Sequence, residues 1–215
     1  MMKFVKVKIV KIHKLTSDYI NANVFILEKN NKCLIIDCGV SLEEVEKVVE
    51  NREVVGILLT HGHYDHSRFC LKYSKRFNCK IFASKYIIKM IKDPEAIYSP
   101  NGEIISDFSN FVLFSKDVDF KLVDFKINAY YCPGHSICSA CYMIDENLFA
   151  GDVLFNKGIG RTDLKYSDTK DMLDTLLKLN KLTFKTVYSG HGQESNFSEQ
   201  QRNISVFIKF LKRHK

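Results

Sequence analysis

Apolar residues recur along the chain in short runs separated by polar turns, and their spacing predicts strands and helices in alternation. Near the start, Lys alternates with Val, Phe and Ile, as in a half-buried strand. The pair Asn30-Asn31 predicts a turn between two strands. We predict strands over 3–12, 20–29, 32–38, 54–60, 79–83, 118–132, 139–150 and 186–189.

Helices are predicted where apolar residues return every three or four positions. Ser41 and Glu44 form a capping box before one such stripe, and Ser198 and Gln201 form another before the last helix. Further helices are predicted over 66–77, 84–92 and about 168–180, and an irregular insertion over 93–110. Strands followed by helices between strands, in both halves of the chain, predict an α/β fold with helices outside packed sheets.

The chain has 215 residues, of which 46% are hydrophobic, and we expect residues 1–215 to form a single domain. No apolar run approaches the roughly 20 residues of a membrane span, so we expect no membrane association. The N-terminus lacks the continuous apolar core of a secretory signal, and the seven cysteines form an odd set. These features predict a cytoplasmic protein with reduced thiols.

The net charge of +7 raises the question of a nucleic-acid partner. The basic residues are mostly Lys and are spread over the whole chain beside 25 acidic groups. Such a distribution lacks the concentrated basic stripe of a nucleic-acid-binding surface. We therefore expect a small-molecule substrate and no nucleic acid, and leave the oligomeric state open.

Three of the seven histidines fall within six residues, directly after the apolar strand 54–60. The segment contains His61, His63, Asp65 and His66. Neutral imidazoles and carboxylates are preferred ligands of zinc and similar divalent metals, and a loop after a buried strand can aim several of them at one point. The segment therefore predicts part of a metal site.

Three further candidates lie at the ends of later strands. His135 follows a Pro-Gly turn, Asp152 ends an apolar run, and His191 lies between two glycines that allow close approach to a ligand. Each alone is a weak signal, because a single polar residue after a strand is more often a cap or a surface group. Together they supply the ligands that the first segment lacks for a site with two metal ions.

The chain resembles the metallo-β-lactamase superfamily over nearly its whole length, in the His61/His63/Asp65/His66 motif, Pro-Gly-His135-Ser, Gly-Asp152 and Gly-His191-Gly. The early Asp37-Cys38-Gly39 is similar to the family's Asp-x-Gly strand end, where the Asp supports the metal loop. The resemblance implies a four-layer αββα sandwich. It also implies one metal on His61, His63 and His135, a second on Asp65, His66 and His191, and Asp152 as a bridge between the two.

Within the superfamily, residues 151–163 resemble the glyoxalase II branch and its relatives. Asp152 differs from the Cys or Ser of the commonest lactamases, which argues against antibiotic hydrolysis. Relatives usually carry Gly soon after the Asp-His pair, where this chain has Ser67-Arg68-Phe69, and only 24 residues follow His191 in place of a helical C-terminal region. The resemblance therefore implies a short form, with glutathione specificity left open.

These features predict a metal-dependent hydrolase, with a thioester as the expected substrate. Two divalent ions, with zinc expected and iron or manganese as alternatives, would lower the pKa of a bound water from its value in bulk water toward about 7. Asp65 is expected to orient the attacking oxygen in addition to binding metal. A thiol of pKa near 8.5 leaves readily as thiolate, so no dedicated general acid is needed.

Three other functions remain open from the sequence. A persulfide dioxygenase would use a single iron on His61, His135 and Asp152. A nuclease would use the same metal scaffold on phosphodiesters. A binding module without activity would need a closed set of ligands, and the sequence shows no extra ligand that would close it.

Overall fold

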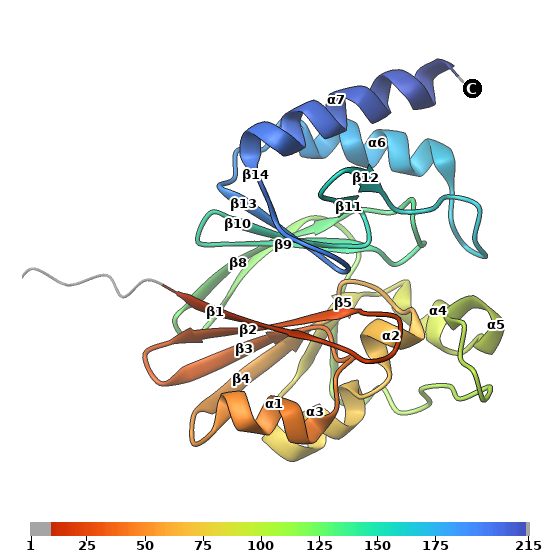
Figure 1. The fold of residues 1–215 in the computed structure, drawn as a ribbon. Helices are drawn as coiled ribbons and strands as arrows, with labels where there is room; N and C mark the ends of the chain where they lie inside the picture. Colours follow the sequence, from red (N-terminus) through yellow and green to blue (C-terminus); the bar gives the residue numbers. More distant parts are fainter. Residues whose placement is uncertain (1–9, 214–215) are drawn as a thin grey trace, which may run out of the picture.

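The computed structural model describes residues 10–213, and two six-stranded sheets packed face to face form its centre (Figure 1). The first sheet has the order β1-β2-β3-β4-β5-β6, with β1 to β3 antiparallel and β3 to β6 parallel. Its strands are β1 (Lys11–Thr16), β2 (Asn23–Lys29), β3 (Lys32–Ile36), β4 (Glu53–Leu58), β5 (Ile81–Ser84) and β6 (Phe111–Phe114).

The second sheet has the order β14-β13-β10-β9-β8-β7, antiparallel except for the parallel pair β10 and β13. Its strands are β7 (Val118–Leu122), β8 (Phe125–Tyr131), β9 (Ala140–Ile144), β10 (Asn147–Gly151), β13 (Thr186–Ser189) and β14 (Ser195–Asn196). A small hairpin of β11 (Leu154–Phe155) and β12 (Gly158–Ile159) follows β10.

Helices cover the outer face of each sheet, which gives the predicted four-layer αββα sandwich (Figure 1). The helices α1 (Leu42–Val49) and α3 (Cys70–Phe77) lie on the first sheet, and α6 (Thr169–Leu179) and α7 (Phe197–Arg213) lie on the second. The shorter α2 (Tyr64–Ser67), α4 (Ile87–Ile91) and α5 (Pro94–Ile97) lie at one end of the sandwich. None of the helices within residues 10–213 is long and apolar enough to cross a membrane.

Three apolar clusters fill the three interfaces between these layers. Alternate residues of β2 and β3 point to opposite sides, because side chains in a strand alternate between the two faces. Val24, Ile26 and Ile35 face α1 and α3, while Phe25 and Leu34 face the second sheet. The continuous apolar runs that predicted these strands therefore belong to a sheet that is buried on both faces.

Three predicted elements are divided in the structure, and one of them, the strand predicted over 139–150, is the hairpin of β9 and β10. The helix predicted over 66–77 is broken, because the backbone N–H of Phe69 donates to the carbonyl of Cys38 (3.2 Å) between α2 and α3. The strand predicted over 118–132 is a hairpin that turns after Leu122, with Val123 at a positive φ of 50°. A β-branched residue is uncommon in that conformation, so the sequence gives no turn signal there.

Other boundaries also differ from prediction. The 93–110 insertion contains α5, whose first turn is capped by the Asp93 side chain, and it is followed by β6, which the apolar pattern did not predict. The last helix is capped by Asn196 and Glu199, which exchange hydrogen bonds with each other's backbone N–H (3.0 and 2.9 Å), and not by Ser198 with Gln201. Residues 3–9 of the first predicted strand lie outside the described residues.

Candidate metal centre

All seven predicted site residues meet at one edge of the two sheets, where the strands that precede them end. His61 and His63 follow β4, and Asp65 and His66 lie in α2. Loops of the second sheet supply the remaining three, namely His135 after β8, Asp152 after β10 and His191 after β13. Six of the seven side chains are buried, and that of His191 is 27% exposed.

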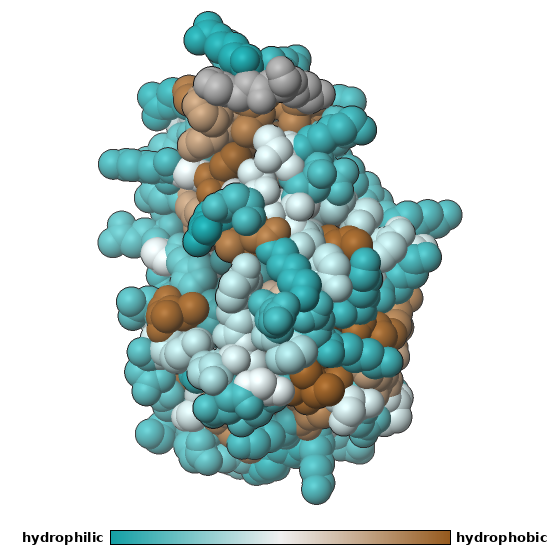
Figure 2. All heavy atoms as spheres, turned by 90° about the vertical axis from the view of Figure 1, so that its right-hand side faces the viewer, coloured by the Kyte–Doolittle hydropathy of each residue, from teal (hydrophilic) through white to brown (hydrophobic). Residues whose placement is uncertain are grey.

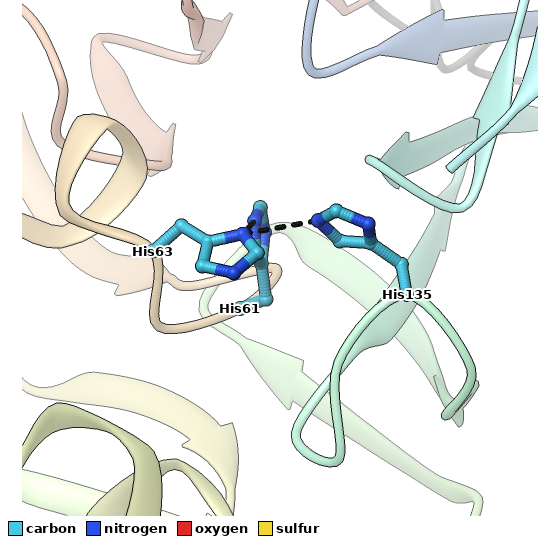
Figure 3. A group of neighbouring side chains, drawn as sticks. All are labelled: His61, His63 and His135. Atoms are coloured by element: carbon cyan, nitrogen blue, oxygen red, sulfur yellow. Dashed lines mark hydrogen bonds between the residues drawn. The ribbon is translucent and has the colours of Figure 1, made fainter. Parts of the chain in front are cut away.

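The first group consists of three imidazoles that point at one another (Figure 3). Nδ1 of His63 lies 2.9 Å from Nε2 of His61 and 3.0 Å from Nε2 of His135. Figure 3 shows His61 and His63 reaching from one loop toward His135, which comes from the other sheet. The group matches the three residues expected to hold the first metal.

The second group consists of Asp65, His66 and His191. Oδ2 of Asp65 lies 3.2 Å from Nε2 of both histidines, whose Nε2 atoms are 3.3 Å apart. Asp152 lies between the two groups, because its carboxylate oxygens are 3.4 Å from His191, 3.5 Å from His66 and 3.6 Å from His135. This is the position expected of a bridging carboxylate.

The outer ring nitrogens of four histidines have oxygen partners, which assign the protons on the rings. Nδ1 of His61 lies 3.0 Å from the Thr60 hydroxyl, and Nδ1 of His66 lies 2.9 Å from the Asp37 carboxylate. Nδ1 of His135 and of His191 face backbone carbonyls, those of Arg161 (3.1 Å) and Asn21 (3.2 Å). A proton on each outer nitrogen leaves a lone pair on each inner nitrogen, as metal ligation requires.

The lone pairs on the inner ring nitrogens face one another at hydrogen-bond distance, and two lone pairs without a proton between them repel each other. Nε2 of His61 and Nε2 of His135, for example, both carry lone pairs once their outer nitrogens donate, and both face Nδ1 of His63. In the described part of the chain, Oδ1 of Asp152 has no hydrogen-bond donor although it is buried. Buried polar atoms need partners, and a cation between these atoms would satisfy all of them at once. The donor set therefore fits two divalent metal ions.

Asp37 supports the metal donors through hydrogen bonds, as the resemblance of Asp37-Cys38-Gly39 to the family's Asp-x-Gly strand end implied. Its carboxylate accepts from the Thr60 backbone N–H and hydroxyl (both 2.8 Å) as well as from His66. Asp37 has a positive φ of 64°, which Asp tolerates better than most residues. Gly39 follows closely, and a Cβ there would lie 1.8 Å from the Asp65 carbonyl oxygen, so only Gly fits.

The electrostatics separate the two groups of donors. Burial lowers the pKa of His63 to about 3 and holds the pKa of His61 well below its usual range, with neighbouring imidazoles adding to the effect. Burial alone would raise the pKa of Asp65, but the charge of His66 and hydrogen bonds from His191 and His66 outweigh it and lower the pKa. The first group is therefore neutral, and the second holds ionised carboxylate.

Hydrogen bonds to the Asp152 and Asp65 carboxylates overcome the opposing effect of burial and raise the pKa of His191 to about 9. In the metal-free protein, a proton on the His191 ring therefore lies between this ring and the two carboxylates. Metal ions and protons compete for the same donor atoms, so metal binding releases protons.

A pocket of about 250 Å³ opens above the donors. Asp65, His63, His135, Asp152 and His191 form its floor, and its walls are mostly apolar or aromatic, contributed by Tyr19, Ile20, Tyr64, Ile97, Tyr98 and Leu164, together with Arg161. Apolar side chains on the face turned toward the viewer in Figure 2 form separate patches among hydrophilic ones. A small pocket with a polar floor and apolar walls suits a small-molecule ligand.

Three contributors to the site were not predicted from the sequence. The carbonyls of Asn21 and Arg161 orient histidines through backbone atoms, which carry no side-chain signal. Tyr98 lies against His63 with 5.5 Å between ring centres, and it has a positive φ of 57° at the end of α5. The place of Tyr98 in the irregular insertion predicted over 93–110 was its sole sequence signal.

Comparison with known proteins agrees with this geometry. Residues 18–191 match the model of the Metallo-beta-lactamase superfamily. The chain is 30% identical over 204 residues to the Probable metallo-hydrolase YqgX of Bacillus subtilis, covering 86% of this chain and 92% of that protein. It is also 30% identical over 175 residues to Hydroxyacylglutathione hydrolase 1 of Vibrio vulnificus, covering 78% of this chain but 61% of that longer protein.

The fold is likewise similar to solved structures. The crystal structure of BLEG-1 B3 metallo-beta-lactamase superimposes with a TM-score of 0.82 and 25% sequence identity, covering 92% of this chain and 99% of that chain. The likeness extends over both sheets and their outer helices, so the predicted architecture is confirmed.

Proposed function

Because this chain belongs to the metallo-beta-lactamase superfamily and carries the His and Asp groups of a metallo-hydrolase, we propose that it hydrolyses a thioester at a dinuclear metal centre. The observation that carries the proposal is the pair of donor groups that share Asp152 beneath an apolar pocket. Two cations held by these groups would polarise a carbonyl group bound in the pocket.

The donor geometry supports a specific assignment of ligands. His61, His63 and His135 would hold one metal and Asp65, His66 and His191 the other, with Asp152 between the two groups. When bound, the two ions supply an activated water and polarise the substrate carbonyl. Zinc is the metal we expect, with iron or manganese as alternatives.

The protein's own groups position these reactants. Asp65 faces the pocket and is ionised, so its carboxylate can accept a hydrogen bond from the attacking oxygen and orient it. The apolar wall excludes water from the far side of the acyl group. Fixed rings and a fixed carboxylate need little rearrangement during the reaction, which favours catalysis.

A thioester suits a pocket in which two of the polar lining side chains are already paired. Among the lining residues, Tyr64 donates to Glu103 (2.9 Å), and Arg161 is paired with Asp163 (2.9 Å). An amine or alkoxide leaving group would need a proton from such a group, whereas a thiolate with a pKa near 8.5 does not. The similarity of residues 151–163 to the glyoxalase II branch, and of the chain to a hydroxyacylglutathione hydrolase, supports the same substrate class.

The test combines metal analysis with a substrate panel on natively purified protein. The panel contains lactoyl-glutathione, other acyl thioesters, a chromogenic β-lactam, a phosphodiester, and a thiol persulfide with oxygen-uptake detection. We expect two metal ions per chain and the highest kcat/KM with a thioester. One iron per chain with persulfide-dependent oxygen uptake, or a β-lactam as the best substrate, would overturn the proposal.

A matched pair of variants shows whether turnover depends on the centre. His135→Gln removes a metal donor, while His13→Gln changes a histidine on β1 that pairs with Glu28 (3.0 Å) away from the site. We expect the first variant to lose at least about 100-fold in kcat/KM, as for loss of a group that stabilises the transition state. The second should keep the activity of the unaltered protein.

A further inference from the structure

Arg68 is an almost buried guanidinium next to the metal motif, at the end of α2. Its side chain is 13% exposed, and the carboxylate closest to it, that of Asp18, is 3.8 Å away and fully exposed to solvent. An exposed, distant carboxylate neutralises a buried charge poorly. The position of Arg68 must therefore be maintained by contacts other than an ion pair.

Oxygen atoms of two separate loops hold the guanidinium. Nε and Nη2 both donate to the Gly39 carbonyl, the first at 2.9 Å, and Nη2 also donates to the Ser17 hydroxyl at 2.9 Å. The rings of Phe69 (4.6 Å) and Tyr19 (5.2 Å) flank its planar group. Planar forked donors with aromatic contacts are a property of Arg that Lys does not share.

Arg68 holds the loop between β1 and β2, residues 17–22, which contains residues in an unfavourable backbone conformation. Ser17 N–H donates to the Ala22 carbonyl (2.8 Å), and the Ser17 hydroxyl accepts from Tyr19 N–H (3.0 Å). Ile20 and Asn21 have positive φ angles of 47° and 55°, and Ile20 is 59% exposed. A β-branched residue in this region costs about 1–3 kcal/mol, so the surroundings must fix the loop.

The same loop completes the centre. The carbonyl of Asn21 accepts from Nδ1 of His191 (3.2 Å), while Tyr19 and Ile20 form one wall of the pocket. Ala22 also pairs with His191 in an isolated antiparallel β-bridge. The only donor in the second group that comes from the other sheet is thus oriented by the β1–β2 loop.

We infer that Arg68 is a positioning residue that clamps the β1–β2 loop so that the Asn21 carbonyl fixes the His191 ring over the second metal. The inference rests on the proposed function, because it takes His191 as a ligand. It assigns a purpose to a residue that stands where relatives usually carry Gly, and it predicts that the guanidinium acts on metal affinity without touching metal or substrate.

A merely structural role for Arg68 would lower stability and leave metal affinity unchanged. The test therefore uses Arg68→Met, which keeps an unbranched stem between the two rings but removes the donors. The matched control is Arg76→Met on α3, where the guanidinium also lies over a ring, that of Phe77 (5.7 Å), and pairs with Glu46 at the exposed surface.

Zinc affinity is measured by competition between the zinc-loaded full chain and a chromophoric chelator. We expect Arg68→Met to weaken, by about 10- to 100-fold, the ion that is lost in the reference variant His191→Ala, as is typical when a group that orients a metal ligand is removed, and to leave the other ion unchanged. Arg76→Met should match the unaltered protein. The visible spectrum of the cobalt-loaded Arg68→Met variant should change at one of the two ions.

Two more variants keep the outcome decisive. Ser17→Ala removes the loop-side acceptor of Arg68 together with the hydrogen bond from Tyr19 N–H, and should weaken the same ion roughly 2- to 10-fold, the range of a net hydrogen bond, even if Arg68→Met does not fold. His191→Ala is the reference. Two ions of unaltered affinity in His191→Ala would refute the proposed ligand set, whereas loss of one ion there with none in Arg68→Met and Ser17→Ala would refute the role of Arg68 alone.

Discussion

Replacing Asp37 by Asn changes an acceptor oxygen into a donor while keeping the shape of the side chain, and we expect it to weaken one metal ion. Asn tolerates a positive φ as well as Asp does, so the 64° conformation adds no new strain. The amide oxygen can keep the bond from the Thr60 N–H. The amide NH₂ then meets Nδ1 of His66, which also carries a proton.

Two donors cannot share this position, so His66 must move its proton to the other ring nitrogen. That nitrogen, Nε2, is the atom that faces Asp65 and His191. A proton there removes the lone pair needed for a metal. Loss of such a supporting group typically reduces metal affinity 10- to 100-fold, which corresponds to about 1.4–2.7 kcal/mol.

The assay is thermal unfolding at a metal concentration 100 times the dissociation constant of the unaltered protein. Binding then stabilises the fold by about 2.7 kcal/mol, and a tenfold weaker site gives about 1.4 kcal/mol. For a chain of this size the difference corresponds to a Tm lower by roughly 3–5 °C. The metal-dependent part of the shift should vanish when both proteins are metal-free.

Asp145→Asn is the matched control, since Asp145 also has a positive φ (45°) but lies at a turn where it pairs with Lys29 (3.0 Å). It should bind metal like the unaltered protein. Equal metal affinity in Asp37→Asn and Asp145→Asn would show that the proton on His66 does not control the second group, and the argument from ring protonation would be wrong.

Three further results are expected. Gly39→Ala should lower the free energy of unfolding, measured by urea denaturation, by more than about 3 kcal/mol, because the added Cβ would lie 1.8 Å from the Asp65 carbonyl oxygen. Gly158→Ala is the control, since open space surrounds Gly158, and it should change the free energy of unfolding little. Chelation of the metal should abolish thioester turnover and lower Tm, with recovery on adding zinc; turnover that persists in metal-free protein would exclude the proposed mechanism. Zinc binding at pH 7 should release protons, because a His191 pKa of about 9 means that the ring is protonated in the metal-free state, and calorimetry in buffers of different ionisation enthalpy detects the release.

The apolar runs predicted strands with helices outside packed sheets, because the inner strands of both sheets are buried on both faces. The four layers were implied by the resemblance to the metallo-β-lactamase superfamily. The sequence also predicted which residues would meet, since His61, Asp152 and His191 each stand at the end of an apolar run. The break between α2 and α3 was not predictable in this way. It depends on a bond from Phe69 to the Cys38 carbonyl, a contact between segments about 30 residues apart.

The groups behind the ligands were only half predictable. Asp37 was identified because Asp37-Cys38-Gly39 is similar to the family's Asp-x-Gly strand end, and a side-chain function of this kind requires a particular residue type. The acceptors behind His135 and His191 are main-chain carbonyls of Arg161 and Asn21, whose residue types say nothing about that task. Arg68 drew notice only as a departure from its relatives, and its contacts with the β1–β2 loop required the structure.

The origin of the donors links metal binding to the packing of the two sheets. His61, His63, Asp65 and His66 follow β4 of the first sheet, whereas His135, Asp152 and His191 follow strands of the second, so each proposed metal is held from both sides. Apolar packing already joins the sheets at Phe25 and Phe149, whose rings are 5.5 Å apart. The apolar core between the sheets therefore lies apart from the metal donors, whereas at the edge cations would replace the protons of the metal-free state. Metal binding should consequently order the loops at this edge more than the core between the sheets.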